Sequence, residues 1–155
     1  EDPYLAWPEL KSVMETVQKQ FDFVTMDNIG FGSTIFAVKP GDGSAREQAA
    51  SCQKVLGGWA NIANEYATKR YRSNLINWGM LPFVVGKGAL PFKNKEYVFV
   101  PGIREAVSEK ADVIIAYAIS GTSVTEFEMT LGDLTDHERE IILDGCLINY
   151  NRTDK

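Results

Sequence analysis

The chain has few of the side chains that usually hold metals or form disulfides. Among its 155 residues are two cysteines, Cys52 and Cys146, and a single histidine, His137. Two cysteines are too few for a disulfide framework or for a metal site made of cysteine alone. His137 falls in the first turn of an expected helix, where an exposed and ordinary histidine is the default. We therefore expect neither a zinc site nor a Cys–His nucleophile.

Long apolar runs and an excess of positive charge are also missing. No stretch reads as a signal peptide or is apolar enough to cross a membrane, and with so few cysteines this predicts a cytoplasmic protein. The 16 basic and 21 acidic residues give a net charge of −5, which argues against a general nucleic-acid binder. The only basic cluster, Lys69-Arg-Tyr-Arg72, is expected to be a solvated face or a carboxylate-binding patch.

The chain does have enough apolar residues for one folded domain. Apolar periodicity and turn residues predict helices over 8–20, about 44–56 and about 64–78, and a last helix that opens with the capping box Thr135-Asp-His-Glu138. They predict strands over 33–39, 59–63, 81–85, 97–100, 112–119 and 123–131, with a short strand and a loop in 21–32. Pro82 suggests an edge strand or the start of one. The pattern indicates one α/β domain with a mixed sheet.

A glycine-rich turn at 41–50, Gly-Asp-Gly-Ser-Ala-Arg-Glu-Gln-Ala-Ala, joins an expected strand to an expected helix. Such a turn directs unpaired backbone N–H groups and the positive end of the helix dipole at one point. With Ser44 at the helix start and Arg46 in its first turn, this corner suits a carboxylate or a phosphate. It is not a P-loop, because it lacks the Gly-Lys-Ser/Thr ending.

The same residues also have a purely structural interpretation. Ser44 and Glu47 have the spacing of a capping box, and Gly41 and Gly43 could serve only to supply turn dihedrals. Because capping boxes are common at helix starts, spacing alone favours this interpretation. Both interpretations stay open at this point.

Two motifs resemble the C-terminal swivel domain of the aconitase family. Residues 41–50 and the later Leu56-Gly-Gly58 are similar to the family's Gly-x-Gly-Ser-Ser-Arg-Glu-His-Ala loop and its Leu-Gly-Gly. Residues 71–82, Tyr-Arg-Ser-Asn-Leu-Ile-Asn-Trp-Gly-Met-Leu-Pro, are similar to its Asn-Leu…Gly-Leu-Leu-Pro segment. The order of elements agrees too, so the resemblance covers nearly the whole chain. The residues of the motifs are most similar to those of bacterial hydratases of the family. It implies an aconitase-like swivelling β/β/α domain over 1–155, with a mixed sheet flanked by helices.

The resemblance implies a hydro-lyase or isomerase that acts on a hydroxylated di- or tricarboxylic acid. By that analogy Ser44 is the base that removes a proton next to a carboxylate, and Arg46 holds a substrate carboxylate. Gly43 and Ala45 complete the expected substrate-binding loop, whose N–H groups would stabilise Ser44 as an alkoxide. Two positions depart from the family: Ala45 stands where a second serine is usual, and Gln48 replaces a histidine.

Members of the family hold a 4Fe–4S cluster through three cysteines in other domains, which Cys52 and Cys146 cannot do. We therefore expect no metal in this chain and a cluster-bearing partner, either in the same longer protein or as a large subunit. The isolated domain is expected to be inactive. The alternative is a non-catalytic polycarboxylate-binding module of aconitase ancestry, which Ala45 and Gln48 favour somewhat. Only the basic cluster supports a role in RNA binding.

Overall fold

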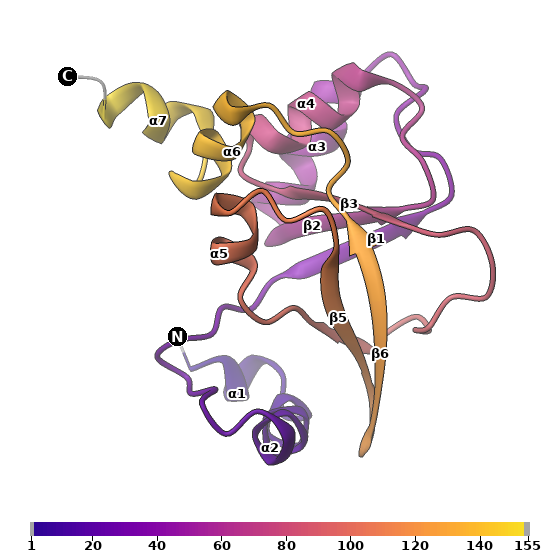
Figure 1. Ribbon diagram of the computed structural model, residues 1–155, viewed down its shortest axis with the longest axis vertical. Coiled ribbons are helices and arrows are strands. Elements are labelled where there is room, and N and C mark those ends of the chain that lie inside the picture. Colours follow the sequence, from indigo (N-terminus) through magenta and orange to yellow (C-terminus); the bar gives the residue numbers. More distant parts are fainter. Residues whose placement is uncertain (1, 154–155) are drawn as a thin grey trace. The chain divides into compact units, whose positions relative to one another are not determined.

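The computed structural model describes residues 2–153, which form a mixed six-stranded sheet with helices (Figure 1). The strands are β1 (Ser33–Ala37), β2 (Gly58–Ala63), β3 (Leu81–Val85), β4 (Tyr97–Phe99), β5 (Ile114–Ser120) and β6 (Ser123–Thr130). Their order in the sheet is β1-β2-β3-β6-β5-β4. The first three strands are parallel, whereas β6 runs antiparallel to β3 and β4 antiparallel to β5. The α/β fold with a mixed sheet is therefore confirmed.

Seven helices occur within residues 2–153: α1 (Pro3–Ala6), α2 (Leu10–Gln20), α3 (Arg46–Val55), α4 (Lys69–Asn77), α5 (Ile103–Ser108), α6 (Asp136–Leu143) and α7 (Leu147–Thr153). The sequence did not predict α1, α5 or α7, which have four, six and seven residues. Helices this short contain too few turns for an apolar period to show. None of the helices in this part of the chain is long and apolar enough to cross a membrane.

The fold divides into two compact units, to both of which β5 and β6 contribute residues. One unit comprises 2–30, 88–101 and 115–128. In it, α2 buries Leu10, Met14 and Val17 on one face, as its apolar period predicts. The Phe21 ring that follows α2 lies 4.8 Å from the ring of Tyr117 on β5.

The other unit comprises 31–87, 102–114 and 129–153 and contains the glycine-rich turn. Its parallel strands are joined by α3 and α4, the crossover connections that parallel pairing requires. Ala50 of α3 packs with Tyr71 and Leu75 of α4 and with Met80 in a buried cluster. This cluster holds α3, the helix that follows the turn, against α4.

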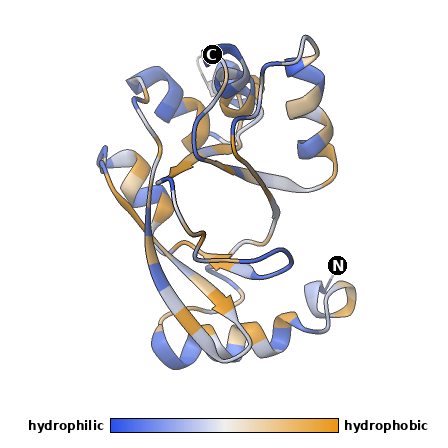
Figure 2. Cartoon of the chain, turned by 90° about the vertical axis from the view of Figure 1, so that its right-hand side faces the viewer, coloured by the Kyte–Doolittle hydropathy of each residue, from blue (hydrophilic) through white to orange (hydrophobic). Residues whose placement is uncertain are grey.

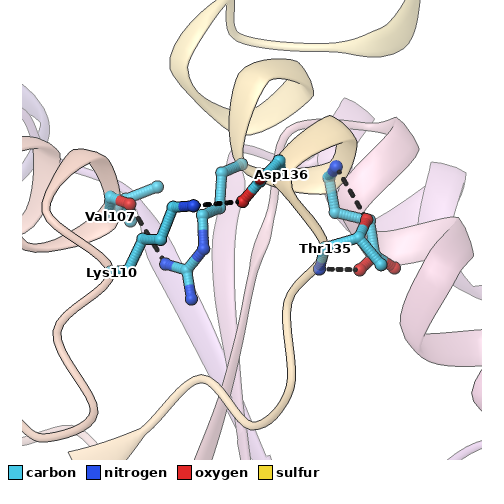
Figure 3. A network of polar contacts seen from close by, with 6 residues as sticks. Val107, Lys110, Thr135 and Asp136 are labelled. Atoms are coloured by element: carbon cyan, nitrogen blue, oxygen red, sulfur yellow. Dashed lines mark hydrogen bonds and ion pairs between the residues drawn. The ribbon is translucent and has the colours of Figure 1, made fainter.

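The last strand and the helix after it form as the sequence predicts. Along β6, polar and apolar residues alternate, and the alternation is visible in the hydropathy colours of Figure 2. The capping box at α6 is confirmed: Glu138 N–H donates to the Thr135 hydroxyl at 3.2 Å, and Thr135 N–H donates to the Glu138 carboxylate at 2.8 Å (Figure 3). Lys110 Nζ lies 2.7 Å from Asp136 Oδ1 in the same first turn.

The helix predicted over 64–78 begins only at Lys69, with Thr68 as its N-cap in an extended conformation. The residues before it are held elsewhere. The N–H groups of Glu65 and Ala67 donate to the carbonyls of Val38 and Pro40, which follow β1. Because these two backbone bonds tie the segment to a distant part of the chain, it forms a loop.

The short strand predicted within 21–32 is absent from the described structure, and that expectation was wrong. The Asn28 side chain accepts from Thr25 N–H at 2.8 Å and donates to the Phe23 carbonyl at 2.7 Å. An asparagine that satisfies nearby backbone groups favours a turn over a strand. Pro82 is the second residue of β3, before that strand's pairing with β6 begins at Val84.

Candidate functional site

The turn between β1 and α3 leaves the start of the helix without a side-chain cap. Arg46 is the first helical residue, and Ala45 occupies the N-cap position with no side chain that can accept a hydrogen bond. Ser44, one residue earlier, is exposed and its hydroxyl has no hydrogen-bond partner among residues 2–153. The predicted Ser44–Glu47 capping box is therefore wrong. The Glu47 carboxylate instead accepts from Nε1 of Trp78, the residue that follows α4, at 3.0 Å.

The missing cap changes what this corner can do. The first N–H groups of an α-helix have no acceptor within the helix and carry the positive end of its dipole. At α3 no serine or threonine oxygen satisfies them. Gly43 has no heavy atom within 4 Å of the point where a Cβ would stand, so the approach there is open. The arrangement can accept an anionic oxygen.

Gly41, the first residue of the turn, packs against Tyr71 of α4. Its φ of +101° is one that side chains rarely adopt, and a Cβ at this position would lie 2.5 Å from the Cβ of Tyr71. Its carbonyl accepts two hydrogen bonds, from Arg46 Nε at 2.9 Å and from the Thr68 hydroxyl at 3.0 Å. Only glycine fits here, because the ring of Tyr71 occupies the space of a side chain.

Arg46 is half-buried and is held by its inner nitrogen alone. Nε–H is bonded to the Gly41 carbonyl, while the two Nη groups have no partner in the part of the chain that the structure describes. A guanidinium with free terminal N–H groups can bind a carboxylate through two parallel hydrogen bonds. The structure thus brings the expected site residues, Gly43 to Arg46, to one corner. Ser44, with its free hydroxyl, precedes Arg46, with its free Nη groups, by two residues.

The family model of the aconitase C-terminal domain matches residues 12–88, a range that includes the turn and both helices beside it. This match supports an aconitase-family C-terminal domain. It is 28% identical over 126 residues to aconitate hydratase A of Rickettsia bellii (strain RML369-C), a match that covers 78% of this chain. The chain spans 14% of the length of that relative.

A polar network behind the turn of this aconitase-type domain was not expected from the sequence. The Tyr71 hydroxyl accepts from Asn61 Nδ2 at 2.9 Å and from Gln53 Nε2 at 3.0 Å. It links α4 to β2 and to α3. Asn61 is buried in an otherwise apolar strand, and that single polar residue in the run 59–63 is the signal that could have indicated the network.

Tyr66 forms a second link, between β2 and β3 of this domain. Its hydroxyl shares its one hydrogen between the carbonyls of Phe83 at 3.0 Å and Asn61 at 3.3 Å. Burial raises the pKa of Tyr66 well above its ordinary value, and the nearby Tyr71 adds to the effect. Tyr66 therefore stays neutral and keeps its proton for these bonds throughout the physiological range.

The basic cluster does not form one surface. Lys69 and Arg70 are exposed, Tyr71 is buried, and the half-buried Arg72 donates to the Leu131 carbonyl at 2.8 Å. Within the cluster, only Lys69 and Arg70 are thus solvated as the sequence led us to expect.

A cavity of about 240 Å³ lies beside the first turn of α3. It is lined by Glu47, Asn74, Asn77, Trp78, Cys146, Leu147 and Ile148. Cys146 is half-buried there, whereas Cys52 is exposed on α3. No group of three or more histidine, cysteine or acidic side chains among residues 2–153 is arranged to hold a metal ion.

Proposed function

We propose that this chain supplies a serine base and a carboxylate-binding arginine to an aconitase-like hydro-lyase that acts on a hydroxy di- or tricarboxylic acid. One observation carries the proposal. The first turn of α3 has no side-chain cap, and the unpaired groups of Ser44 and Arg46 stand beside it. The free groups at this corner match the needs of an anionic substrate.

Arg46 would bind a substrate carboxylate with its two Nη groups. The guanidinium is planar and always charged, so it offers two parallel donors at the spacing of carboxylate oxygens. Because the bond from Nε to the Gly41 carbonyl restrains the side chain, less conformational freedom is lost on binding.

Ser44 would take the proton from the carbon next to a carboxylate. The electron pair of that C–H bond would form the double bond as the hydroxyl leaves the neighbouring carbon. An ordinary serine is too weak a base for this, so its anionic form needs stabilisation. The uncapped N–H groups and the dipole at the start of α3 are suited to supply it.

Activation of the leaving hydroxyl would come from outside this chain. The family resemblance implies a 4Fe–4S cluster in other domains, which as a Lewis acid would polarise the substrate hydroxyl. The residues described here do not form a site for such a cluster. We therefore expect the cluster-bearing domains to be the partner and the 155-residue chain alone to be inactive.

The test uses the intact protein that carries this chain, reconstituted with iron and sulfide and assayed with cis-aconitate and related acids. Ser44→Ala should lower kcat by about 10²- to 10⁴-fold with little change in KM, the range for loss of a general base. Ser51→Ala is the matched control, because its hydroxyl bonds within α3 to the Gln48 carbonyl. Undiminished turnover in Ser44→Ala would contradict the proposed base.

Replacing Arg46 tests substrate binding separately. Arg46→Ala should raise KM by roughly 10- to 100-fold, as expected for the loss of a charged hydrogen-bonded pair. Ala45 and Gln48, which depart from the family motif, favour a second function, that of a polycarboxylate-binding module without turnover. An inactive wild-type protein that binds citrate, with binding lost in Arg46→Ala, would favour that module.

A further inference from the structure

We propose that Thr68 is a positioning residue for Arg46 and that it acts through the carbonyl of Gly41. Holding this carbonyl in place fixes the Nε side of the guanidinium and leaves only its terminal Nη edge for an anion. The inference rests on the proposed function, since it concerns how Arg46 meets a carboxylate. Nothing in the sequence motif of the turn points to Thr68, which lies 27 residues after Gly41.

The Thr68 hydroxyl makes two hydrogen bonds, one of which uses its only donor hydrogen. It donates its single hydrogen to the Gly41 carbonyl at 3.0 Å and accepts from Tyr71 N–H at 3.2 Å as the N-cap of α4. A hydroxyl has one donor hydrogen, so this one cannot turn toward another acceptor without releasing Gly41. The half-buried position of Thr68 also limits its exchange with water.

Gly41 is held on its other side by sterics. At a φ of +101° its Cα faces the ring of Tyr71, which leaves no room for a side chain. Thr68 and Tyr71 both belong to the start of α4, so one helix end fixes both the position and the direction of the Gly41 carbonyl. That carbonyl is the only acceptor of Arg46 within the described residues.

The consequence is a defined geometry of recognition. Because Nε–H is used, Arg46 can offer a carboxylate its two Nη groups but not the side-on pair of Nε and one Nη. Without the Thr68 hydroxyl, the Gly41 carbonyl would be free to turn and Arg46 would regain side-chain rotamers. Restoring this freedom should weaken carboxylate binding roughly 5- to 20-fold.

The experiment compares three variants of the intact reconstituted protein, with citrate as the binding probe. Thr68→Val removes the hydroxyl and should raise the Kd of citrate, while Thr68→Ser keeps it and should bind as wild type does. Thr135→Val is the matched control, because it also removes a threonine N-cap in the same unit but has no bond to the turn. In an Arg46→Ala background, Thr68→Val should add nothing, since it acts through Arg46.

Hydrogen–deuterium exchange, followed by mass spectrometry, measures directly how well the backbone N–H groups of the turn are protected. Thr68→Val should speed exchange in peptides that cover 41–47, and Thr135→Val should not. Thr68→Asp is a second variant for this readout: its carboxylate still caps α4 but has no hydrogen to donate to Gly41. It should also speed exchange in the turn while α4 stays folded.

The outcomes separate this inference from the proposed function. Unchanged exchange at 41–47 in Thr68→Val and Thr68→Asp would overturn the positioning role. So would unchanged citrate binding in Thr68→Val when Arg46→Ala weakens it. If Arg46→Ala itself leaves citrate binding unchanged, the proposed function fails, and the exchange data alone then decide whether Thr68 holds the turn.

Discussion

Two glycines in one turn have different reasons to be glycine. Gly41 has a φ of +101° and lies against Tyr71, whereas no positive φ occurs at Gly43 and the space around it is open. The first is required by backbone conformation and by close packing. The second leaves access to the free groups that follow it. Identical residues two positions apart thus serve stability and access separately.

Alanine substitution should separate these two roles. Gly41→Ala should lower the free energy of unfolding by about 1–3 kcal/mol or more, because it adds both a strained conformation and a clash. Gly43→Ala should change it by less than about 0.5 kcal/mol, as is usual for surface positions without special contacts. Denaturant unfolding measures both. Equal losses in the two variants would contradict the steric role of Tyr71.

At the scale of the helices, three helix starts in the same unit are built in three ways. Thr135 caps α6 in a reciprocal box, Thr68 caps α4 and also bonds Gly41, and α3 begins with Ala45 and has no side-chain cap. A helix start without a cap gives up about 1 kcal/mol of stability. At α3 the first-turn N–H groups therefore stay without a side-chain acceptor, as the proposed function requires.

This difference predicts that removing the Thr135 hydroxyl costs stability and that removing the Ser44 hydroxyl does not. Thr135→Val should lower the free energy of unfolding by about 1 kcal/mol, the usual value of an N-cap. Ser44→Ala should leave it unchanged within about 0.5 kcal/mol, because the Ser44 hydroxyl caps nothing. Thermal or denaturant unfolding checks both. A loss in Ser44→Ala as large as that in Thr135→Val would show that Ser44 does cap α3.

At the scale of the whole molecule, Tyr66 should make stability depend on alkaline pH. Burial holds its folded-state pKa above the ordinary value of 10.0, while in the unfolded chain it ionises near that value. The neutral hydroxyl therefore contributes stability that is fully present below pH 10 and is lost as pH rises from there toward the folded-state pKa. We expect the free energy of unfolding to fall steadily above about pH 10.

Tyr66→Phe tests this dependence. It should cost about 1 kcal/mol near neutral pH, because it removes the bonds to two carbonyls, and it should flatten the alkaline slope. Tyr117→Phe is the comparison. The pKa of Tyr117 is also raised, by burial and by its bond to Glu126, but that bond is exposed, so its removal should have a smaller effect. An unchanged slope in Tyr66→Phe would contradict the role of Tyr66.

Regular periods and local turn chemistry account for what the sequence predicted correctly. The strands of the sheet, α2 and the capping box of α6 depend on residues close together in the chain. Two of the errors arose where distant partners intervened. The segment 64–68 is a loop because its N–H groups bond the residues after β1, and Glu47 binds Trp78 rather than the helix start. Neither partner is visible in a local pattern.

The sequence by itself indicated an aconitase-type domain, the six strands of the sheet, and the turn that carries Ser44 and Arg46. Only the tertiary structure decided that α3 has no side-chain cap, that Gly41 must be glycine, and that Thr68 holds its carbonyl. The physical reason is one of range. Periodicity and capping signals act over a few residues, whereas the bond from Thr68 to the Gly41 carbonyl spans 27 residues and forms only when α4 packs beside α3.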